Sequence, residues 1–134
     1  TIRYNGEGWG ITTDGKRLFL SDGSSTIREI DPETFATKRS ILVSFNGQPL
    51  DYINELEWAN GKIWANIYLT SAIVEINPTT GIVEGYVDLP ELRSHLKDNP
   101  EAEAFNGVAS NPTTGRFYVT GKDWNKIFEI EIVK

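Results

Sequence analysis

The sequence predicts an all-β fold, and three observations support this prediction. Most of the aromatic residues, which make up 11% of the chain, lie in short runs rich in β-branched residues. Gly, Asn and Asp separate these runs in place of a helical period. A unit of strand, tight turn and strand also occurs three times along the chain. The first two units begin roughly 45 residues apart, which is the length of one four-stranded antiparallel blade of a β-propeller.

We expect the first blade over residues 1–45 and the second over residues 52–89. Asp14-Gly15 predicts a tight turn in the first blade, and Asn60-Gly61 predicts one in the second. These residues supply the positive φ angles that short hairpins require. Each blade therefore begins with an inner hairpin.

The first two blades each end with an outer strand, expected over residues 37–45 and 82–89. The third blade, over residues 105–134, is incomplete because no outer strand follows its third strand. Propellers close with typically four to eight blades, and about three are present here. We therefore expect that a longer protein supplies the missing blades, that two copies of the chain associate as a homodimer, or that pieces of the domain were lost. Residues 1–4 are expected to be the tail of an outer strand from a preceding blade.

A helical insertion is expected over residues 90–104, between the second and third blades. The segment Pro90–Lys97 predicts a short helix within it. The single histidine, His95, lies in this helix and is expected to be solvated.

Composition excludes several classes of function. The 134 residues carry 19 acidic and 13 basic side chains, a formal net charge of -6, and this argues against nucleic-acid binding. No apolar run approaches the roughly 20 residues of a membrane span, so we expect no membrane partner. The chain has no cysteine, one histidine and no phosphate-binding glycine loop. We therefore expect no metal and no cofactor.

Four polar and aromatic clusters mark the places where a propeller lines its central channel. They open the three blades or follow a second strand, and they cover residues 4–10, 52–58, 105–109 and 120–124. Each cluster alone also has a structural explanation, since tryptophan packs between blades and asparagine caps turns. Together they are candidate site residues.

The order of these motifs resembles the C-terminal half of the plant and bacterial type of glutaminyl-peptide cyclotransferase (glutamine cyclotransferase). The resemblance runs from Gly8 to Lys134, and its main stretches are Gly8-Trp9-Gly10, Asn54-Glu55-Leu56-Glu57-Trp58, Ile63-Trp64-Ala65-Asn66-Ile67, Asn106-Gly107-Val108-Ala109 and Val119-Thr120-Gly121-Lys122-Asp123-Trp124. It implies a five-bladed propeller about twice this long. It also implies cyclisation of an N-terminal glutamine to pyroglutamate with loss of ammonia, and a secreted or periplasmic location. The implied partner is a peptide with an N-terminal glutamine.

The resemblance implies roles for six residues. Lys122 and Asn54 are the expected catalytic residues, because a lysine stabilises an oxyanion and an asparagine orients an amide or amine without adding charge. Trp9 and Tyr68 are expected to form aromatic walls for the substrate, with Tyr68 standing where the family usually has tryptophan. Glu55 and Asn106 complete the expected substrate-binding set, although Glu55 could instead form a structural hydrogen bond.

One expected feature is absent from these 134 residues. The resemblance places the family's proton-transferring glutamate in an earlier Gly-Glu-Gly motif. Glu7 lies in such a triplet, but the triplet runs into Trp9-Gly10 and matches a second, non-catalytic copy of the motif. Two alternatives therefore stay open: a non-catalytic, self-assembling propeller fragment, and a binding module that shares only the blade sequence.

Overall fold

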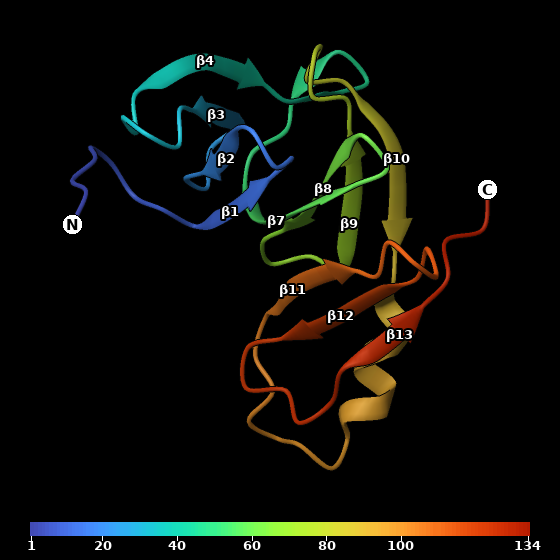
Figure 1. The fold of residues 1–134 in the computed structure, drawn as a ribbon. Helices are drawn as coiled ribbons and strands as arrows, with labels where there is room; N and C mark the ends of the chain where they lie inside the picture. The colour runs from blue at the N-terminus through green and yellow to red at the C-terminus, as the bar shows by residue number, and fades with distance from the viewer.

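The computed structural model describes residues 1–134, and its strands form three antiparallel sheets and one small hairpin (Figure 1). The first sheet contains β1 (Gly10–Thr13), β2 (Leu18–Ser21), β3 (Thr26–Ile30) and β4 (Thr37–Leu42), in that order. The second contains β7 (Ile53–Ala59), β8 (Lys62–Ile67), β9 (Ala72–Ile76) and β10 (Val83–Asp88). The third contains β11 (Phe105–Ser110), β12 (Phe117–Gly121) and β13 (Phe128–Ile130). The chain is thus all-β, as the sequence predicted.

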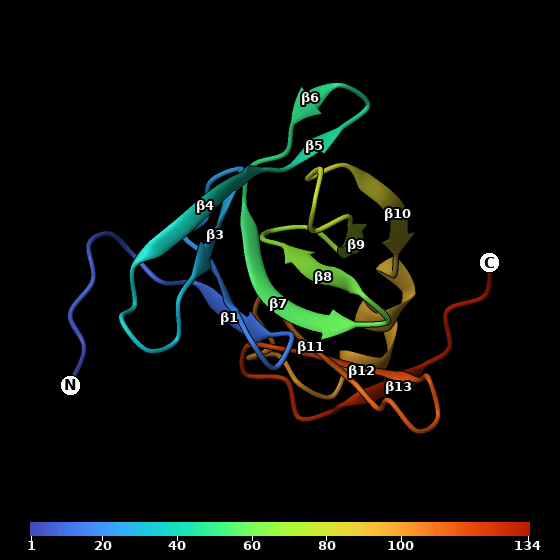
Figure 2. The same cartoon turned by 45° about the horizontal axis from the view of Figure 1, so that its top comes forward.

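The first strands of the three sheets lie next to one another (Figure 2). β7 contacts both β1 and β11, so the second sheet stands between the other two. Each sheet then continues outward in sequence order. This arrangement brings the beginnings of β1, β7 and β11 to one end of the molecule.

The two predicted hairpin turns differ in their backbone. Asn60 and Gly61 have φ angles of 53° and 74°, as a two-residue hairpin turn requires. In the Asp14-Gly15 turn of the first sheet, only Gly15 has a positive φ, 93°. The carboxylate of Asp14 accepts hydrogen bonds from the backbone N–H groups of Lys16 and Arg17, which stabilise a turn that needs one left-handed residue.

The predicted outer strand over residues 37–45 is wrong at its C-terminal end. β4 ends at Leu42, and β5 (Ser44–Phe45) pairs instead with β6 (Gln48–Pro49). The backbone leaves the first sheet because the N–H of Ser44 bonds to the oxygen of Gly81, next to the second sheet. Gly81 permits this approach, since a Cβ atom there would lie 2.1 Å from the oxygen of Leu42.

One other segment differs from expectation, whereas the short helix of the insertion and its exposed His95 are found as expected. Residues 1–4 form no strand. In the insertion, Pro90–Leu96 (η1) is a 3₁₀-helix whose Leu92 and Leu96 are buried, and His95 is exposed on it. The structure has no helix with the length and apolarity that a membrane span requires.

Apolar side chains fill both spaces between the sheets. Between the first and second sheets, Phe19 and Trp58 stack with ring centroids 5.5 Å apart. Between the second and third sheets, Trp64 packs on Phe117 at 4.8 Å. Burial of this apolar surface is the main force that holds the sheets together.

Polar contacts repeat at both interfaces between sheets. At each one, two side chains of the earlier sheet bond to the backbone of the next inner strand. The contacts are Trp58 N–H to Thr12 Oγ1 (2.9 Å), Ser21 Oγ to the oxygen of Asn54 (2.6 Å), Ser110 N–H to Glu57 Oε2 (2.6 Å) and Gly107 N–H to Asn66 Oδ1 (3.0 Å). They hold the inner strands in place relative to one another. They therefore also determine how the beginnings of these strands, where the candidate site lies, are arranged.

Candidate functional site

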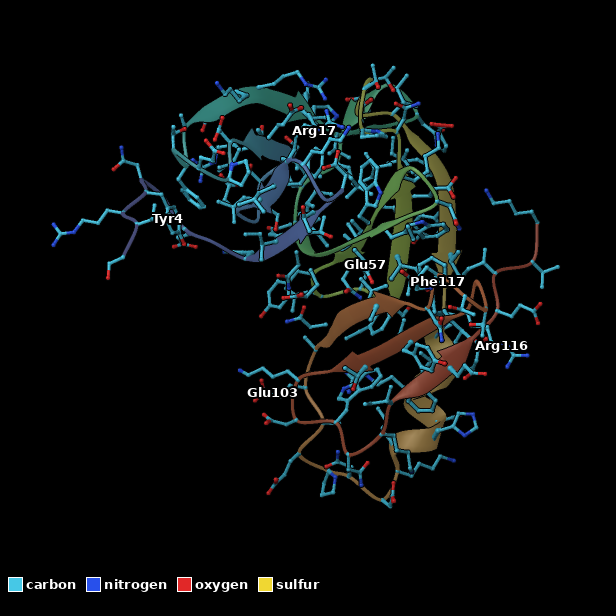
Figure 3. All side chains as sticks on the ribbon, in the orientation of Figure 1. Tyr4, Arg17, Glu57, Glu103, Arg116 and Phe117 are labelled. Atoms are coloured by element: carbon cyan, nitrogen blue, oxygen red, sulfur yellow. The ribbon has the colours of Figure 1, made fainter.

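All six predicted site residues lie at the same end of the three sheets. Trp9 directly precedes β1, while Asn54, Glu55 and Asn106 lie at the beginnings of β7 and β11. Tyr68 and Lys122 directly follow β8 and β12. Because β8 and β12 are antiparallel to their inner strands, they end where those strands begin. In Figure 3, Glu103 marks this end of the third sheet and Arg116 marks the opposite end.

Trp9 and Tyr68 meet although they come from different sheets. Their ring centroids are 5.4 Å apart, with the rings edge to face at 77°. Trp9 also packs on Gly23, where a Cβ atom would lie 2.5 Å from the indole ring. Tyr52 joins the loop of Gly23 to that of Tyr68, since its N–H bonds to the backbone oxygen of Gly23 and its backbone oxygen accepts the N–H of Tyr68. The two rings form one aromatic wall.

Lys122 forms an ion pair with Glu103 at the edge of the third sheet. Its Nζ atom lies 2.9 Å from Glu103 Oε2, and both side chains are more than half exposed. The hydrogen bond that Lys122 donates to Glu103 raises the pKa of Lys122, and charge interactions with Asp123 and Tyr68 act in the same direction. Lys122 is therefore a protonated donor beside the aromatic wall. The sequence did not identify Glu103, whose only signal is its place just before the third inner strand.

Asn54 and Asn106 occupy equivalent positions in two β-bulges. The pairing of β7 with β8 shifts between Ile53 and Leu56, and that of β11 with β12 shifts between Phe105 and Val108. A bulge places two residues opposite one and changes the direction in which a side chain points. Asn54 is buried, and its side-chain amide forms no hydrogen bond within the chain. It is therefore free to bind a ligand group.

Glu55 follows Asn54 in the first bulge and is half-buried. Its carboxylate has no hydrogen bond or ion pair within the chain, and burial raises its pKa. It lines a cavity of about 280 Å³ together with Trp9, Gly10 and Leu20. Glu55 thus reaches the same region as the aromatic wall and is suited to exchange a proton.

Asn66 belongs to the site region, although the sequence did not single it out. It is fully buried on β8, and its Oδ1 atom accepts the N–H of Gly107. Its Nδ2 donor and the Oδ1 acceptor of Asn106 are both buried without a partner. Two unpaired groups of opposite character are suited to hold a water molecule or a polar ligand group. The only sequence signal was the motif Ile63-Trp64-Ala65-Asn66-Ile67.

Glu7 has a structural contact, because its Oε2 atom accepts a 2.9 Å hydrogen bond from Trp9 Nε1. No group of three or more histidine, cysteine, aspartate or glutamate side chains could hold a metal ion.

Comparison with known proteins decides the family. The model of the glutamine cyclotransferase family matches residues 1–132. The chain belongs to the glutamine cyclotransferase family. Over 128 residues it is 39% identical to a glutaminyl-peptide cyclotransferase of Arabidopsis thaliana. The crystal structure of Myxococcus xanthus glutaminyl cyclase superposes with a TM-score of 0.90 at 42% sequence identity.

Two more distant structures share the fold alone. The β-propeller domain of Myceliophteria thermophila Cps50 (Swd1) is 15% identical with a TM-score of 0.59, and virginiamycin B lyase of Staphylococcus aureus is 19% identical with a TM-score of 0.56. They cover 99% and 96% of the chain. The three sheets are therefore arranged as in a β-propeller.

The chain spans only part of the length of its relatives. The alignment with the Arabidopsis protein covers 94% of this chain but 40% of that protein. The superposition with the Myxococcus enzyme covers 96% of this chain and 56% of that one.

Proposed function

We propose that this chain forms part of the active site of a glutaminyl-peptide cyclotransferase, which converts an N-terminal glutamine into pyroglutamate. Family membership supports this reaction. The observation that carries the proposal is the convergence of Trp9, Tyr68, Lys122 and Asn54 at one end of the sheets.

The reaction is an intramolecular acyl transfer. The α-amino nitrogen of the substrate attacks the carbon of its own side-chain amide, and a C–N bond forms. The bond from that carbon to the amide nitrogen breaks, and a proton moves from the attacking nitrogen to the departing ammonia. The protein supplies no nucleophile; it holds the glutamine in a curled conformation, transfers the proton and stabilises the oxyanion.

Lys122 is assigned to the oxyanion. Its raised pKa keeps the ammonium charged, so it donates hydrogen bonds and positive charge to the developing negative oxygen. Glu103 and Lys122 are both largely exposed. The ammonium of Lys122 therefore leaves Glu103 for the oxyanion at low cost, because water solvates the carboxylate that it leaves.

In this proposal Trp9 and Tyr68 contact the aliphatic part of the glutamine. Asn54 and Asn106 form hydrogen bonds with its polar groups. The aromatic pair offers a flat apolar surface that favours the curled side chain. Neutral amides in two equivalent bulges orient the substrate amide and amine by hydrogen bonds. Such positioning supplies a large part of the rate enhancement of intramolecular reactions.

Glu55 is the proton-exchanging candidate among these residues. It has no partner within the chain, and burial raises its pKa, which favours uptake of a proton. The resemblance assigns proton transfer to a glutamate in an earlier Gly-Glu-Gly motif, so Glu55 would act with that group or in its place.

Further blades of a five-bladed ring complete the site in this proposal, and the protein acts in a secreted or periplasmic location. The exposed apolar side chains of Ile11 and Tyr4, 52% and 45% exposed, support a further blade beside the first sheet. The relatives are long enough to supply one.

Ammonia release from a peptide that begins with glutamine tests the proposal. The complete polypeptide that contains residues 1–134 is compared with its Lys122→Ala variant, and we expect a loss of about 100-fold in kcat. Lys62→Ala is the matched control, since Lys62 forms an ion pair with Glu84 of the same 2.9 Å length at the opposite end of the sheets. Equal activity of all three proteins would refute the role of Lys122.

The same assay on the 134-residue chain separates the alternatives. Activity of this chain alone would mean that the site assembles without further blades. Absence of activity, with a native mass of about twice the 15.0 kDa of one chain, would support a self-assembling fragment or homodimer.

A further inference from the structure

A large cavity adjoins the candidate site on its outer side. It measures about 650 Å³ and lies between the second and third sheets, which is the size range of small-molecule and side-chain pockets. Its walls come from the β8–β9 loop, the end of β10, the insertion and the β12–β13 loop. These are the segments at the same end as Lys122 and Tyr68.

Two wall residues connect the cavity directly to the site. Glu103 lines the cavity and forms the 2.9 Å ion pair with Lys122. Leu69 lines the cavity and immediately follows Tyr68. The cavity therefore begins at the ion-pair partner of Lys122 and at the residue that follows Tyr68.

The wall formed by the third sheet is preorganised. Phe105 and Trp124 stack at 5.7 Å, and Trp124 Nε1 donates a 2.9 Å hydrogen bond to the oxygen of Glu103. The guanidinium of Arg93 lies over Trp124 at 5.6 Å and donates hydrogen bonds to the backbone oxygens of Ala102 and Glu103. Through these contacts Arg93 supports the aromatic surface, and it also lines the cavity.

Leu69 is unusual in both conformation and exposure. Its φ angle is 66°, a left-handed conformation that is costly for leucine, and its side chain is 73% exposed. The strained backbone makes Leu69 a candidate for a ligand contact. On the opposite wall, Asp88 carries a carboxylate whose one contact is the Ser71 hydroxyl. The cavity thus combines apolar side chains with the carboxylates of Asp88 and Glu103 and the guanidinium of Arg93, so its lining carries one net negative charge.

We propose that this cavity binds the side chain of the residue that follows the N-terminal glutamine and favours a large apolar side chain over glycine or an acidic residue. This inference rests on the proposed cyclotransferase function. An extended chain advances about 3.3–3.6 Å per residue, so the second residue of a substrate held at Lys122 reaches the rim formed by Glu103. The apolar walls bury its side chain, and Asp88 repels a carboxylate.

The test compares kcat/KM for peptides that begin Gln-Phe, Gln-Gly and Gln-Glu in the complete polypeptide that contains residues 1–134. We expect Gln-Phe to exceed Gln-Gly by about fivefold or more, with Gln-Glu lowest. Leu69→Ala should reduce the Phe-to-Gly ratio about threefold while Gln-Gly turnover stays within twofold. Leu42→Ala is the control, since Leu42 is 55% exposed on β4 outside the cavity.

The outcomes separate this inference from the proposed function. Turnover of all three peptides with equal kcat/KM, or a Phe-to-Gly ratio that Leu69→Ala and Leu42→Ala leave equally unchanged, would overturn the cavity assignment and leave the cyclotransferase function intact. Turnover of none of them would overturn both. Leu69→Asn, which suits a left-handed backbone but removes the apolar surface, should lower the ratio as Leu69→Ala does and exclude a loss of folding as the cause.

Discussion

The side-chain oxygen of Asn66 accepts a 3.0 Å hydrogen bond from the backbone N–H of Gly107, across the interface between the second and third sheets. Asn66 is fully buried, and Gly107 lies in the bulge that presents Asn106. One contact therefore fixes the relative position of two sheets and the backbone of a proposed substrate-binding residue.

Asn66→Ala should lower the free energy of unfolding by about 1–3 kcal/mol, because it leaves the partly buried N–H of Gly107 without its partner. Urea unfolding measures the change. Asn5→Ala is the control, since Asn5 is exposed. The same small change in both variants would contradict a stabilising role for the Asn66 contact.

Tyr68→Phe and Tyr68→Ala separate the ring of Tyr68 from its hydroxyl. Because the ring contacts Trp9 at 5.4 Å, Tyr68→Phe keeps the aromatic wall, and we expect kcat/KM for a glutamine peptide within about twofold of the parent. Tyr68→Ala removes the wall and should reduce kcat/KM by about tenfold. A large loss with Tyr68→Phe would assign the hydroxyl a direct role.

Glu103→Gln should change the pH dependence of kcat/KM. Glu103 raises the pKa of Lys122, so its replacement by a neutral amide lowers that pKa toward the ordinary value for lysine. If protonated Lys122 stabilises the oxyanion, the fall in activity at alkaline pH moves to lower pH. Glu84→Gln, which removes the partner of Lys62, should leave the profile unchanged. An unchanged profile in Glu103→Gln would contradict the assignment of Lys122.

Glu55→Gln should stabilise the protein more at pH 7 than at pH 4. Burial raises the pKa of Glu55, so the folded state holds its proton more tightly than the unfolded state does. The folded state is therefore destabilised as pH rises through the interval between the unfolded and folded pKa values, and this penalty is absent below that interval. Urea unfolding at the two pH values measures it, with the exposed Glu33→Gln as control. If Glu55→Gln raised the free energy of unfolding equally at both pH values, ionisation of Glu55 would not be the cause of the stabilisation.

Local patterns were sufficient to predict much of the fold. The Asn60-Gly61 turn was predicted correctly because a two-residue hairpin needs two positive φ angles, and this dipeptide adopts them at low cost. The end of β4 could not be predicted, because a contact between Ser44 and Gly81, distant in sequence, draws the backbone out of the first sheet. The first turn was only partly correct, since the carboxylate of Asp14 replaces a second left-handed residue.

The candidate site was predictable to the extent that its residues lie in recognisable motifs at strand ends. Asn66 and Glu103 were missed because their importance depends on partners 41 residues and 19 residues away, Gly107 and Lys122.

The sequence by itself determined the all-β class, the turn of the second hairpin and the residues of the family motifs, because these depend on neighbouring residues and their periodicity. Only the tertiary structure decided that Trp9 meets Tyr68, that Glu55 has no partner and that Glu103 joins Lys122 to a cavity. Those properties depend on how separate sheets pack against one another. No local sequence pattern encodes the distances between side chains of different sheets.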